Sequence, residues 1–298
     1  MATVSVVVAT YRRDAVLQRA LDSLVKQTYK DFEVILVDDN DNAEWNAKVA
    51  QIAENFCVKN PTIPLRCVQN HPNLGSARTR NAGIKAASGE YICFLDDDDV
   101  YCPPRIENQL MPMMEKKADY GVTDLALYTE AEKLVEVRRR EYIQDTSVDA
   151  LLKDHLLYHI TGTDAMMFRR EYLIQIGGFP LIDIGDEFYL MQKAIEAGGA
   201  FLYVPVCDIR AYIDAGDGGL SRGQGKIKGE NDLYEHKKKY FTMLDRKSVR
   251  YIKMRHRIVL AYSYLREKNY LLFGWYGFLG TCCDPMGAWE ILRQRWRK

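Results

Sequence analysis

The sequence predicts an α/β fold, with a mixed, mostly parallel β-sheet flanked by helices and a helical extension at the C-terminus. In the first hundred of the 298 residues, short apolar runs alternate with segments of helical spacing. These runs hold few polar residues, which is typical of strands buried on both faces of a parallel sheet. Polar clusters follow several of the runs directly, at the edge where such a sheet binds its ligands.

The first hundred residues contain the clearest strand and helix signals. Thr3–Thr10 is a run of Val and small residues, and apolar residues recur at helical spacing over Val16–Val25. The same patterns predict strands at Phe32–Val37, Leu65–Val68 and Tyr91–Leu95 and helices at Ala43–Val58 and Ala77–Ala87. Strands that alternate with helices form βαβ units, which build a mostly parallel sheet.

After Pro103-Pro104 the pattern changes. Predicted strands lie at Tyr120–Tyr128, Leu134–Arg139, Ala165–Arg169 and Ala200–Val204, and predicted helices at Arg105–Lys117, Glu171–Ile176, Glu187–Ala197, Asn231–Phe241, Ser248–Lys268 and Met286–Arg297. Gly216–Gly229 holds six glycines in 14 residues and is predicted to be a mobile loop. We expect one domain over residues 1–215, with halves at 1–100 and 101–215, followed by the loop and helical extension over 216–298.

Composition and charge indicate a globular intracellular protein with a basic tail. Apolar residues are 47% and charged residues 28%, which excludes a disordered chain. Residues 246–298 carry 12 basic and 3 acidic side chains, although the whole chain has zero net charge. The seven scattered cysteines form no C-x-x-C pair, and no secretory pattern opens the chain, so we expect reduced thiols in the cytoplasm. The longest apolar stretch, Tyr270–Cys283, is shorter than the ~20 residues of a membrane-spanning helix.

Four consecutive aspartates, Asp96 to Asp99, follow the strand at Tyr91–Leu95 and are the strongest chemical signal. Adjacent carboxylates repel one another, and a divalent cation removes that cost. Their hard oxygen atoms suit Mg²⁺ or Mn²⁺. A solvated acidic turn that caps the next helix is the alternative, but the position at the expected ligand edge favours a metal site.

Other motifs narrow the class of protein. Asp186 and Glu187 begin an amphipathic helix, where a carboxylate either caps the helix or serves as a general base. The chain lacks the G-x-G-x-x-G, P-loop, G-x-S-x-G and H-E-x-x-H patterns, and its five histidines have no metal-ligand spacing. Dinucleotide-binding enzymes, P-loop nucleotidases, nucleophile-elbow hydrolases and zinc proteases are therefore disfavoured.

Together these segments resemble the family 2 glycosyltransferases, which have the GT-A fold. The resemblance covers about residues 3–205 and is carried by Val4–Tyr11, Phe32–Asp39, Asn73–Gly83, Ala87–Asp99 and Met167–Phe179. The chain departs from the family pattern at Asp186-Glu187, where the usual order is Glu-Asp. A second departure is the run Arg210–Asp214, which lacks the histidine that many members have.

The resemblance implies a site at the strand ends. It assigns Asp186 or Glu187 as the catalytic base, with Asp186 preferred, and Asp96 and Asp98 as metal ligands. It assigns nucleotide binding to Thr10, Tyr11, Arg13, Asp38, Asp39, Arg80 and Asp97, and contact with the diphosphate, from a lid, to Ser221, Arg222 and Lys226.

The resemblance also implies a Mn²⁺- or Mg²⁺-dependent inverting transferase that uses a nucleotide-sugar, expected to be a UDP-sugar. The expected acceptor is a glycan, a lipid-linked sugar or a cell-envelope polymer. An inactive GT-A scaffold and a sugar-phosphate nucleotidyltransferase are the alternatives. For the basic, aromatic tail we weigh packing within the protein or a homodimer against docking to an anionic membrane surface at the inner face of the cell membrane. No nucleic-acid-reading module accompanies the tail, so we expect no nucleic-acid partner.

Overall fold

The structure, a computed structural model, describes residues 2–182, 185–213 and 223–296 and forms two compact units. The first unit, here called the sheet unit, comprises Met1–Leu151 and Ile160–Ile213. The second, the helical unit, comprises Leu152–His159 and Asp214–Lys298. Helix α5 (Val148–Tyr158) begins in the sheet unit and ends in the helical unit.

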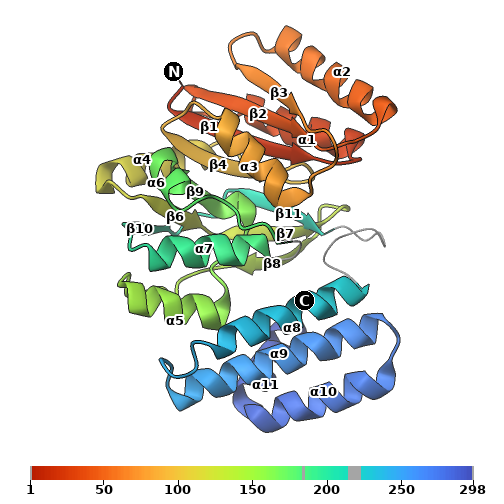
Figure 1. The fold of residues 1–298 in the computed structure, drawn as a ribbon, viewed down its shortest axis with the longest axis vertical. Coiled ribbons are helices and arrows are strands. Elements are labelled where there is room, and N and C mark those ends of the chain that lie inside the picture. Colours follow the sequence, from red (N-terminus) through yellow and green to blue (C-terminus); the bar gives the residue numbers. More distant parts are fainter. Residues whose placement is uncertain (1, 183–184, 214–222, 297–298) are drawn as a thin grey trace. The chain divides into compact units, whose positions relative to one another are not determined.

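A seven-stranded sheet with the order β10-β6-β9-β4-β1-β2-β3 organises the sheet unit (Figure 1). Strand β9 runs antiparallel to both of its neighbours, and the other neighbouring strands are parallel. The mixed, mostly parallel sheet predicted from the sequence is therefore confirmed. Its strands are β1 (Val4–Thr10), β2 (Phe32–Asp38), β3 (Leu65–Gln69), β4 (Tyr91–Asp96), β6 (Tyr120–Thr123), β9 (Met166–Arg169) and β10 (Phe201–Val204).

Helices cover both faces of this sheet, which explains why its central strands β1, β2 and β4 are buried along almost their whole length. Val4, Val6 and Val8 of β1 lie in one core cluster with residues of helices α1, α2 and α4. Val7 points to the other face, where it lies against Gly83 of α3. The helices are α1 (Asp14–Val25), α2 (Ala43–Lys59), α3 (Ser76–Ala86), α4 (Arg105–Lys116), α6 (Arg170–Gln175) and α7 (Asp186–Glu196).

The single strand predicted at Tyr120–Tyr128 is wrong, because part of this segment belongs to a second, four-stranded sheet. That segment is two strands in different sheets, because the chain turns at the buried Asp124. The Asp124 carboxylate accepts hydrogen bonds from the Arg140 N–H (3.0 Å) and the Tyr203 hydroxyl (2.9 Å), which hold the turn. The small sheet has the order β5-β11-β7-β8, with β5 (Val100–Tyr101), β7 (Leu125–Thr129), β8 (Leu134–Arg138) and β11 (Ile209–Ile213).

The helical unit is built from α8 (Gly223–Lys238), α9 (Arg246–Arg266), α10 (Tyr270–Cys283) and α11 (Pro285–Trp296), with the end of α5. The loop predicted over Gly216–Gly229 is wrong from Gly223 onward, where the chain is helical. Ile227 and Glu230 are buried on that helix, so tertiary packing offsets the cost of about 1 kcal/mol for each helical glycine. Among the described residues, no helix is long and apolar enough to span a membrane.

Gly83 tests the packing of α3 on the sheet. A Cβ atom there would overlap the Val7 side chain and lie 3.2 Å from Val37. We predict that Gly83→Ala lowers the free energy of unfolding by about 1–3 kcal/mol, because the buried valines cannot move away. Gly274→Ala in α10 is the control, since nothing beyond the adjoining backbone of the helix and its chain neighbours lies within 4 Å of its Cβ position. That variant should be neutral or stabilising in the same denaturant titration. Equal effects of the two substitutions would contradict the close approach of α3.

Candidate active site

Acidic and polar side chains meet at one edge of the large sheet because of its strand register. Thr10 of β1 pairs with Asp38 of β2, and Ala9 pairs with Asp96 of β4. These strands are parallel, so their carboxyl ends share an edge. Strand β9 is antiparallel to β4, so the start of β9 reaches the same edge. Asp164 lies two residues before β9, outside the strand, and its carboxylate lies beside the backbone of Asp96.

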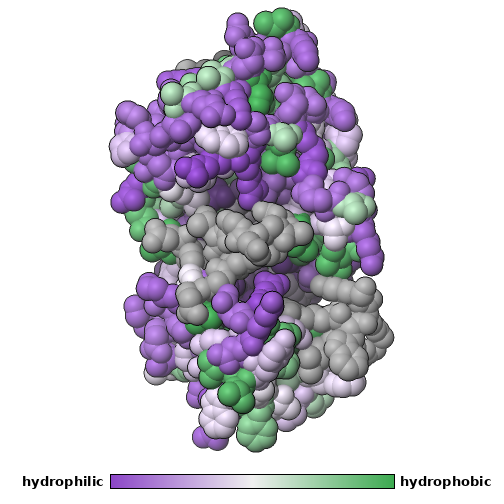
Figure 2. All heavy atoms as spheres, turned by 90° about the vertical axis from the view of Figure 1, so that its right-hand side faces the viewer, coloured by the Kyte–Doolittle hydropathy of each residue, from purple (hydrophilic) through white to green (hydrophobic). Residues whose placement is uncertain are grey.

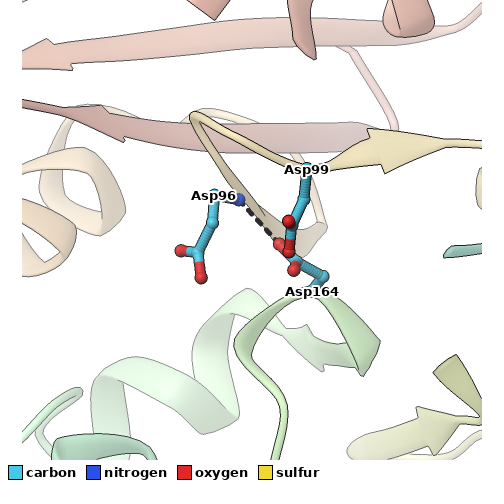
Figure 3. Close-up of side chains that lie close together, drawn as sticks. All are labelled: Asp96, Asp99 and Asp164. Carbon is cyan, nitrogen blue, oxygen red and sulfur yellow. Dashed lines mark hydrogen bonds between the residues drawn. The ribbon is translucent and has the colours of Figure 1, made fainter. Parts of the chain in front are cut away.

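Asp96, Asp99 and Asp164 form a carboxylate cluster, in which one oxygen of each lies within 4.8 Å of the others (Figure 3). The Asp96 N–H donates to the Asp164 carboxylate at 2.6 Å, and the Tyr212 N–H donates to Asp99 at 2.8 Å. In Figure 3 the side chains of Asp99 and Asp164 point toward each other, whereas the Asp96 carboxylate turns to the other side. The cluster combines residues from the end of β4 and the start of β9.

Burial makes the charge of this cluster costly. Burial, and after it the nearby Asp96 carboxylate, raise the pKa of Asp164 to about 7. Burial and then Asp164 raise the pKa of Asp99 well above its ordinary value. Burial also raises the pKa of Asp97 to about 6, against the lowering effects of Thr10 and Arg13. Three carboxylates with hard oxygen atoms in this arrangement fit Mg²⁺ or Mn²⁺, which would neutralise them.

Arg80 joins the cluster to the catalytic candidates. Its guanidinium lies 2.7 Å from the Asp96 carboxylate and 3.2 Å from the Asp186 carboxylate. Burial acts to lower the pKa of Arg80, but the charges of Asp96 and Asp186 outweigh burial and raise it. Arg80 is therefore a fixed cation that connects α3, the end of β4 and the start of α7.

Asp186 and Glu187 have different surroundings at the start of α7. Both Asp186 oxygens are engaged: one accepts from the Glu187 N–H at 3.0 Å, and the other faces Arg80 and the Ser76 hydroxyl. One Glu187 oxygen accepts from the Gly162 N–H and the Thr163 hydroxyl, both at 3.2 Å. Burial raises the pKa of each carboxyl group. Asp186 is buried, whereas Glu187 is partly exposed.

Asp98 does not lie in the carboxylate cluster. Its carboxylate forms an ion pair with Arg13, and its backbone oxygen accepts from Arg19 at 2.7 Å. The structure thus brings Asp96 together with Asp99 and Asp164 rather than with Asp98. Sequence reasoning missed Asp164. Its position just before the predicted strand at Ala165–Arg169 was the available signal, but the antiparallel direction of that strand was not predictable from the sequence.

The remaining nucleotide-binding candidates lie at the ends of β1 and β2. Asp39 is buried and accepts hydrogen bonds from the backbone N–H groups of Leu74 and Gly75 (both 2.9 Å) and the side chains of Asn70 (2.8 Å) and Asn73 (2.9 Å). Asp39 therefore fixes the loop that leads into α3 and Arg80.

The neighbouring residues form a polar end to the two strands. The Asp38 carboxylate accepts from the Asn40 N–H and side-chain amide, at 2.9 and 2.8 Å. Thr10 is buried at the end of β1. Tyr11 is 45% exposed, with the Arg12 guanidinium 5.0 Å from its ring centre. An exposed ring beside buried hydrogen-bonding groups is suited to contact a planar base.

Comparison with known proteins identifies the family. The model for glycosyl transferase family 2 matches residues 5–177, which is more than half of the chain. The chain belongs to glycosyl transferase family 2. Its GT-A fold is confirmed by similar solved structures, including residues 1–349 of TarS from S. aureus, with a TM-score of 0.61 and 16% identity over 94% of this chain and 90% of that one.

Two curated relatives of this family 2 protein are named as glycosyltransferases. The uncharacterized glycosyltransferase MJ1057 of Methanocaldococcus jannaschii is 34% identical over 160 residues, which are 52% of this chain and 53% of the relative. The Escherichia coli enzyme WfaP, a UDP-Glc:alpha-D-GlcNAc-diphosphoundecaprenol beta-1,3-glucosyltransferase, is 29% identical over 124 residues, 42% of this chain and 46% of the relative. The matches thus span about half the length of these relatives.

The predicted lid of this family 2 protein is only partly described. Ser221 and Arg222 lie outside the described residues. Lys226 lies on α8, so the prediction that it belongs to a loop is wrong, whereas its contact with the diphosphate stays a prediction. In the helical unit its charge acts on His159 and Glu230.

The carboxylate cluster predicts how stability depends on pH without metal. Unfolded aspartate titrates near pH 4, whereas Asp164 in the fold has a pKa of about 7. Between these values the folded state binds more protons, so the free energy of unfolding falls as pH rises. In chelator, we predict a lower Tm at neutral pH than at about pH 5, and a weaker dependence in Asp164→Asn. If the Tm of Asp164→Asn depends on pH as strongly as that of the wild type, the carboxylate cluster does not cause the pH dependence.

Proposed function

We propose that this protein is a metal-dependent, inverting glycosyltransferase that moves a sugar from a UDP-sugar to a hydroxyl group of a lipid-linked or cell-envelope glycan. The convergence of Asp96, Arg80 and the Asp186-Glu187 pair at the ligand edge of the sheet is the observation that carries this proposal. Family membership supports the reaction class. The UDP assignment is supported by the name of WfaP and by a solved complex of TarS with UDP-GlcNAc, whose TM-score is 0.59.

The proposed cation is Mn²⁺ or Mg²⁺, held by Asp96 with Asp99 and Asp164. Support comes from the carboxylate cluster and from a similar structure, the mannosyltransferase PcManGT of Pyrobaculum calidifontis, which was solved with GDP-Man and Mn²⁺ (TM-score 0.57). When bound, such an ion stabilises negative charge on a departing diphosphate. Arg80 would add a fixed positive charge beside it, in a buried setting where charges act strongly.

We propose Glu187 as the general base and Asp186 as a positioning residue. Both Asp186 oxygens are already bound, one of them to Arg80, so neither oxygen is open to an acceptor hydroxyl. Glu187 is partly exposed, and its two hydrogen bonds from Gly162 and Thr163 fall on a single oxygen. The contacts thus favour Glu187 as the base. The resemblance to the family had favoured Asp186.

The proposed reaction is a single displacement. Glu187 takes the proton of the acceptor hydroxyl as its oxygen attacks the anomeric carbon. The bond from that carbon to the diphosphate oxygen breaks, the electron pair leaves with the nucleoside diphosphate, and the anomeric configuration inverts. The products are the glycosylated acceptor, the nucleoside diphosphate and a proton. An inactive scaffold would bind the nucleotide without turnover.

An enzyme that uses a lipid-linked acceptor must act at a membrane surface, where that acceptor lies. The name of WfaP specifies an acceptor on diphosphoundecaprenol, and we extend that acceptor class to this chain. We therefore propose a peripheral protein at the cytoplasmic face of the membrane, where nucleotide-sugars are available.

The donor site is tested by thermal shift with UDP, GDP, dTDP and CDP, each with and without Mn²⁺. We expect UDP with Mn²⁺ to raise the Tm, since a ligand at a hundred times its Kd adds about 2.7 kcal/mol. The shift should be lost in Asp96→Asn and kept in the exposed control Glu54→Gln. A UDP shift that is independent of metal, or no shift with any nucleotide, would contradict the proposed donor site.

The base is tested by comparing Glu187→Gln with Asp186→Asn. We expect Glu187→Gln to lower kcat by about 10²–10⁴ while the UDP-dependent Tm shift remains, because a base acts only on the acceptor. Asp186→Asn releases Arg80 and should mainly raise the donor KM. Since burial raises the pKa of Glu187, wild-type kcat should fall with decreasing pH at a higher pH than for an ordinary glutamate. A larger kcat loss in Asp186→Asn than in Glu187→Gln would make Asp186 the base.

A further inference from the structure

Helix α10 of the helical unit is apolar on all sides. Tyr270–Cys283 contains no charged residue. One side packs on α9: a Cβ on Gly280 would lie 2.9 Å from Ile258, and the Tyr276 ring stacks on Tyr264 with 5.4 Å between ring centres. A helix of this composition is normally buried all round. The packing on α9 uses only one side of it.

Another side of α10 is exposed and also apolar. Leu271 is 88%, Trp275 57% and Phe278 62% exposed. These three residues, here called the aromatic face, have the spacing i, i+4 and i+7 and therefore lie on one side of the helix. Met286 and Trp289 of α11 are also largely exposed. On the face drawn in Figure 2, the helical unit shows green and pale residues beside purple ones.

Such a face is unusual for a surface in water. Single exposed apolar residues are common, but a contiguous stripe with two aromatic rings marks an interaction site. The 14 residues of α10 extend about 21 Å, at 1.5 Å per residue, which is short of the ~30 Å of a bilayer core. Helix α10 can therefore lie on a membrane but cannot cross it.

The positive charge of the residues around α10 indicates what binds to the aromatic face. Arg266 and Lys268 are exposed just before α10, and Arg246, Lys247 and Arg250 are exposed on α9. Residues 246–298 carry 12 basic and 3 acidic side chains. A second copy of the chain would bring the same positive charge, whereas an anionic lipid surface is complementary. Trp at the boundary between headgroups and acyl chains is typical of helices that lie on membranes.

We propose that α10 docks in the plane of an anionic phospholipid surface. Leu271, Trp275 and Phe278 insert at the boundary of headgroups and acyl chains, and Arg266 and Lys268 contact lipid phosphates. This inference rests on the proposed function only in that the protein works at a membrane. It does not depend on the reaction that the protein catalyses. It places the helical unit, and not the sheet unit, at the lipid surface.

The test is co-sedimentation of the full chain with vesicles of phosphatidylcholine alone and of phosphatidylcholine mixed equally with phosphatidylglycerol. We expect selective binding to the anionic vesicles that weakens with salt. Trp275→Ser/Phe278→Ser should weaken it about 30-fold, from the loss of two inserted rings. Val58→Ser, which removes an exposed apolar side chain from α2, should leave it unchanged. Arg266→Glu/Lys268→Glu should remove the preference for anionic lipid.

Sedimentation velocity and the UDP thermal shift on the same variants complete the test. Equal binding to both vesicle types, or unchanged binding of Trp275→Ser/Phe278→Ser, would overturn the proposal. A wild-type dimer that this variant converts to monomer would assign the aromatic face to a second copy and would also overturn it. The UDP shift should be the same in all these variants. If UDP does not raise the Tm of the wild type although the wild type binds anionic vesicles, the proposed function is contradicted but the docking is not.

Discussion

The burial of carboxylates around one arginine is the interaction on which the rest of the site depends. Asp96, Asp97, Asp99, Asp164 and Asp186 reach the same edge of the sheet, and Arg80 lies between two of them. Burial is the largest cause that raises the pKa of Asp97, Asp99, Asp164 and Asp186, so negative charge at this edge is unfavourable. A bound proton, a divalent cation or Arg80 can neutralise it. In the proposed function, this edge binds a cation, and that cation also contacts the diphosphate of the donor.

The remaining features hold this arrangement in place. The parallel register of β1, β2 and β4 brings their polar ends together, and the antiparallel β9 adds Asp164 from a distant part of the chain. Asp39 is saturated by the loop before α3, which fixes the helix that carries Arg80. Asp186 then locks Arg80 from the start of α7 and leaves Glu187 partly exposed. In the proposed mechanism, binding of the donor and activation of the acceptor are divided between these two adjacent carboxylates.

The sequence predicted what depends on local pattern. Strands β1 to β4 and the helices between them agree within a few residues, because unbroken apolar runs and helical spacing are local signals. The Asp96–Asp99 run and the Asp186-Glu187 pair were found for the same reason. Asp164 was missed because its approach depends on the direction of β9, which pairs with β4, a strand that lies 74 to 78 residues earlier by the paired residues Cys93↔Met167 and Tyr91↔Arg169. The second half of α8 agrees with the helix predicted at Asn231–Phe241. The first half, from Gly223 to Glu230, was missed because its glycine content disfavours a helix, which the packing of Ile227 and Glu230 stabilises.

The most direct test of this account is the position of Mn²⁺ in crystals grown with UDP, located by anomalous scattering. We predict one strong peak bound directly to the Asp96 carboxylate, on the side of Asp99 and Asp164, with the UDP diphosphate beside it and Asp98 still paired with Arg13. A peak away from Asp96, or bound UDP with no ion, would contradict the claim that this sheet edge is built to hold a cation for the departing diphosphate.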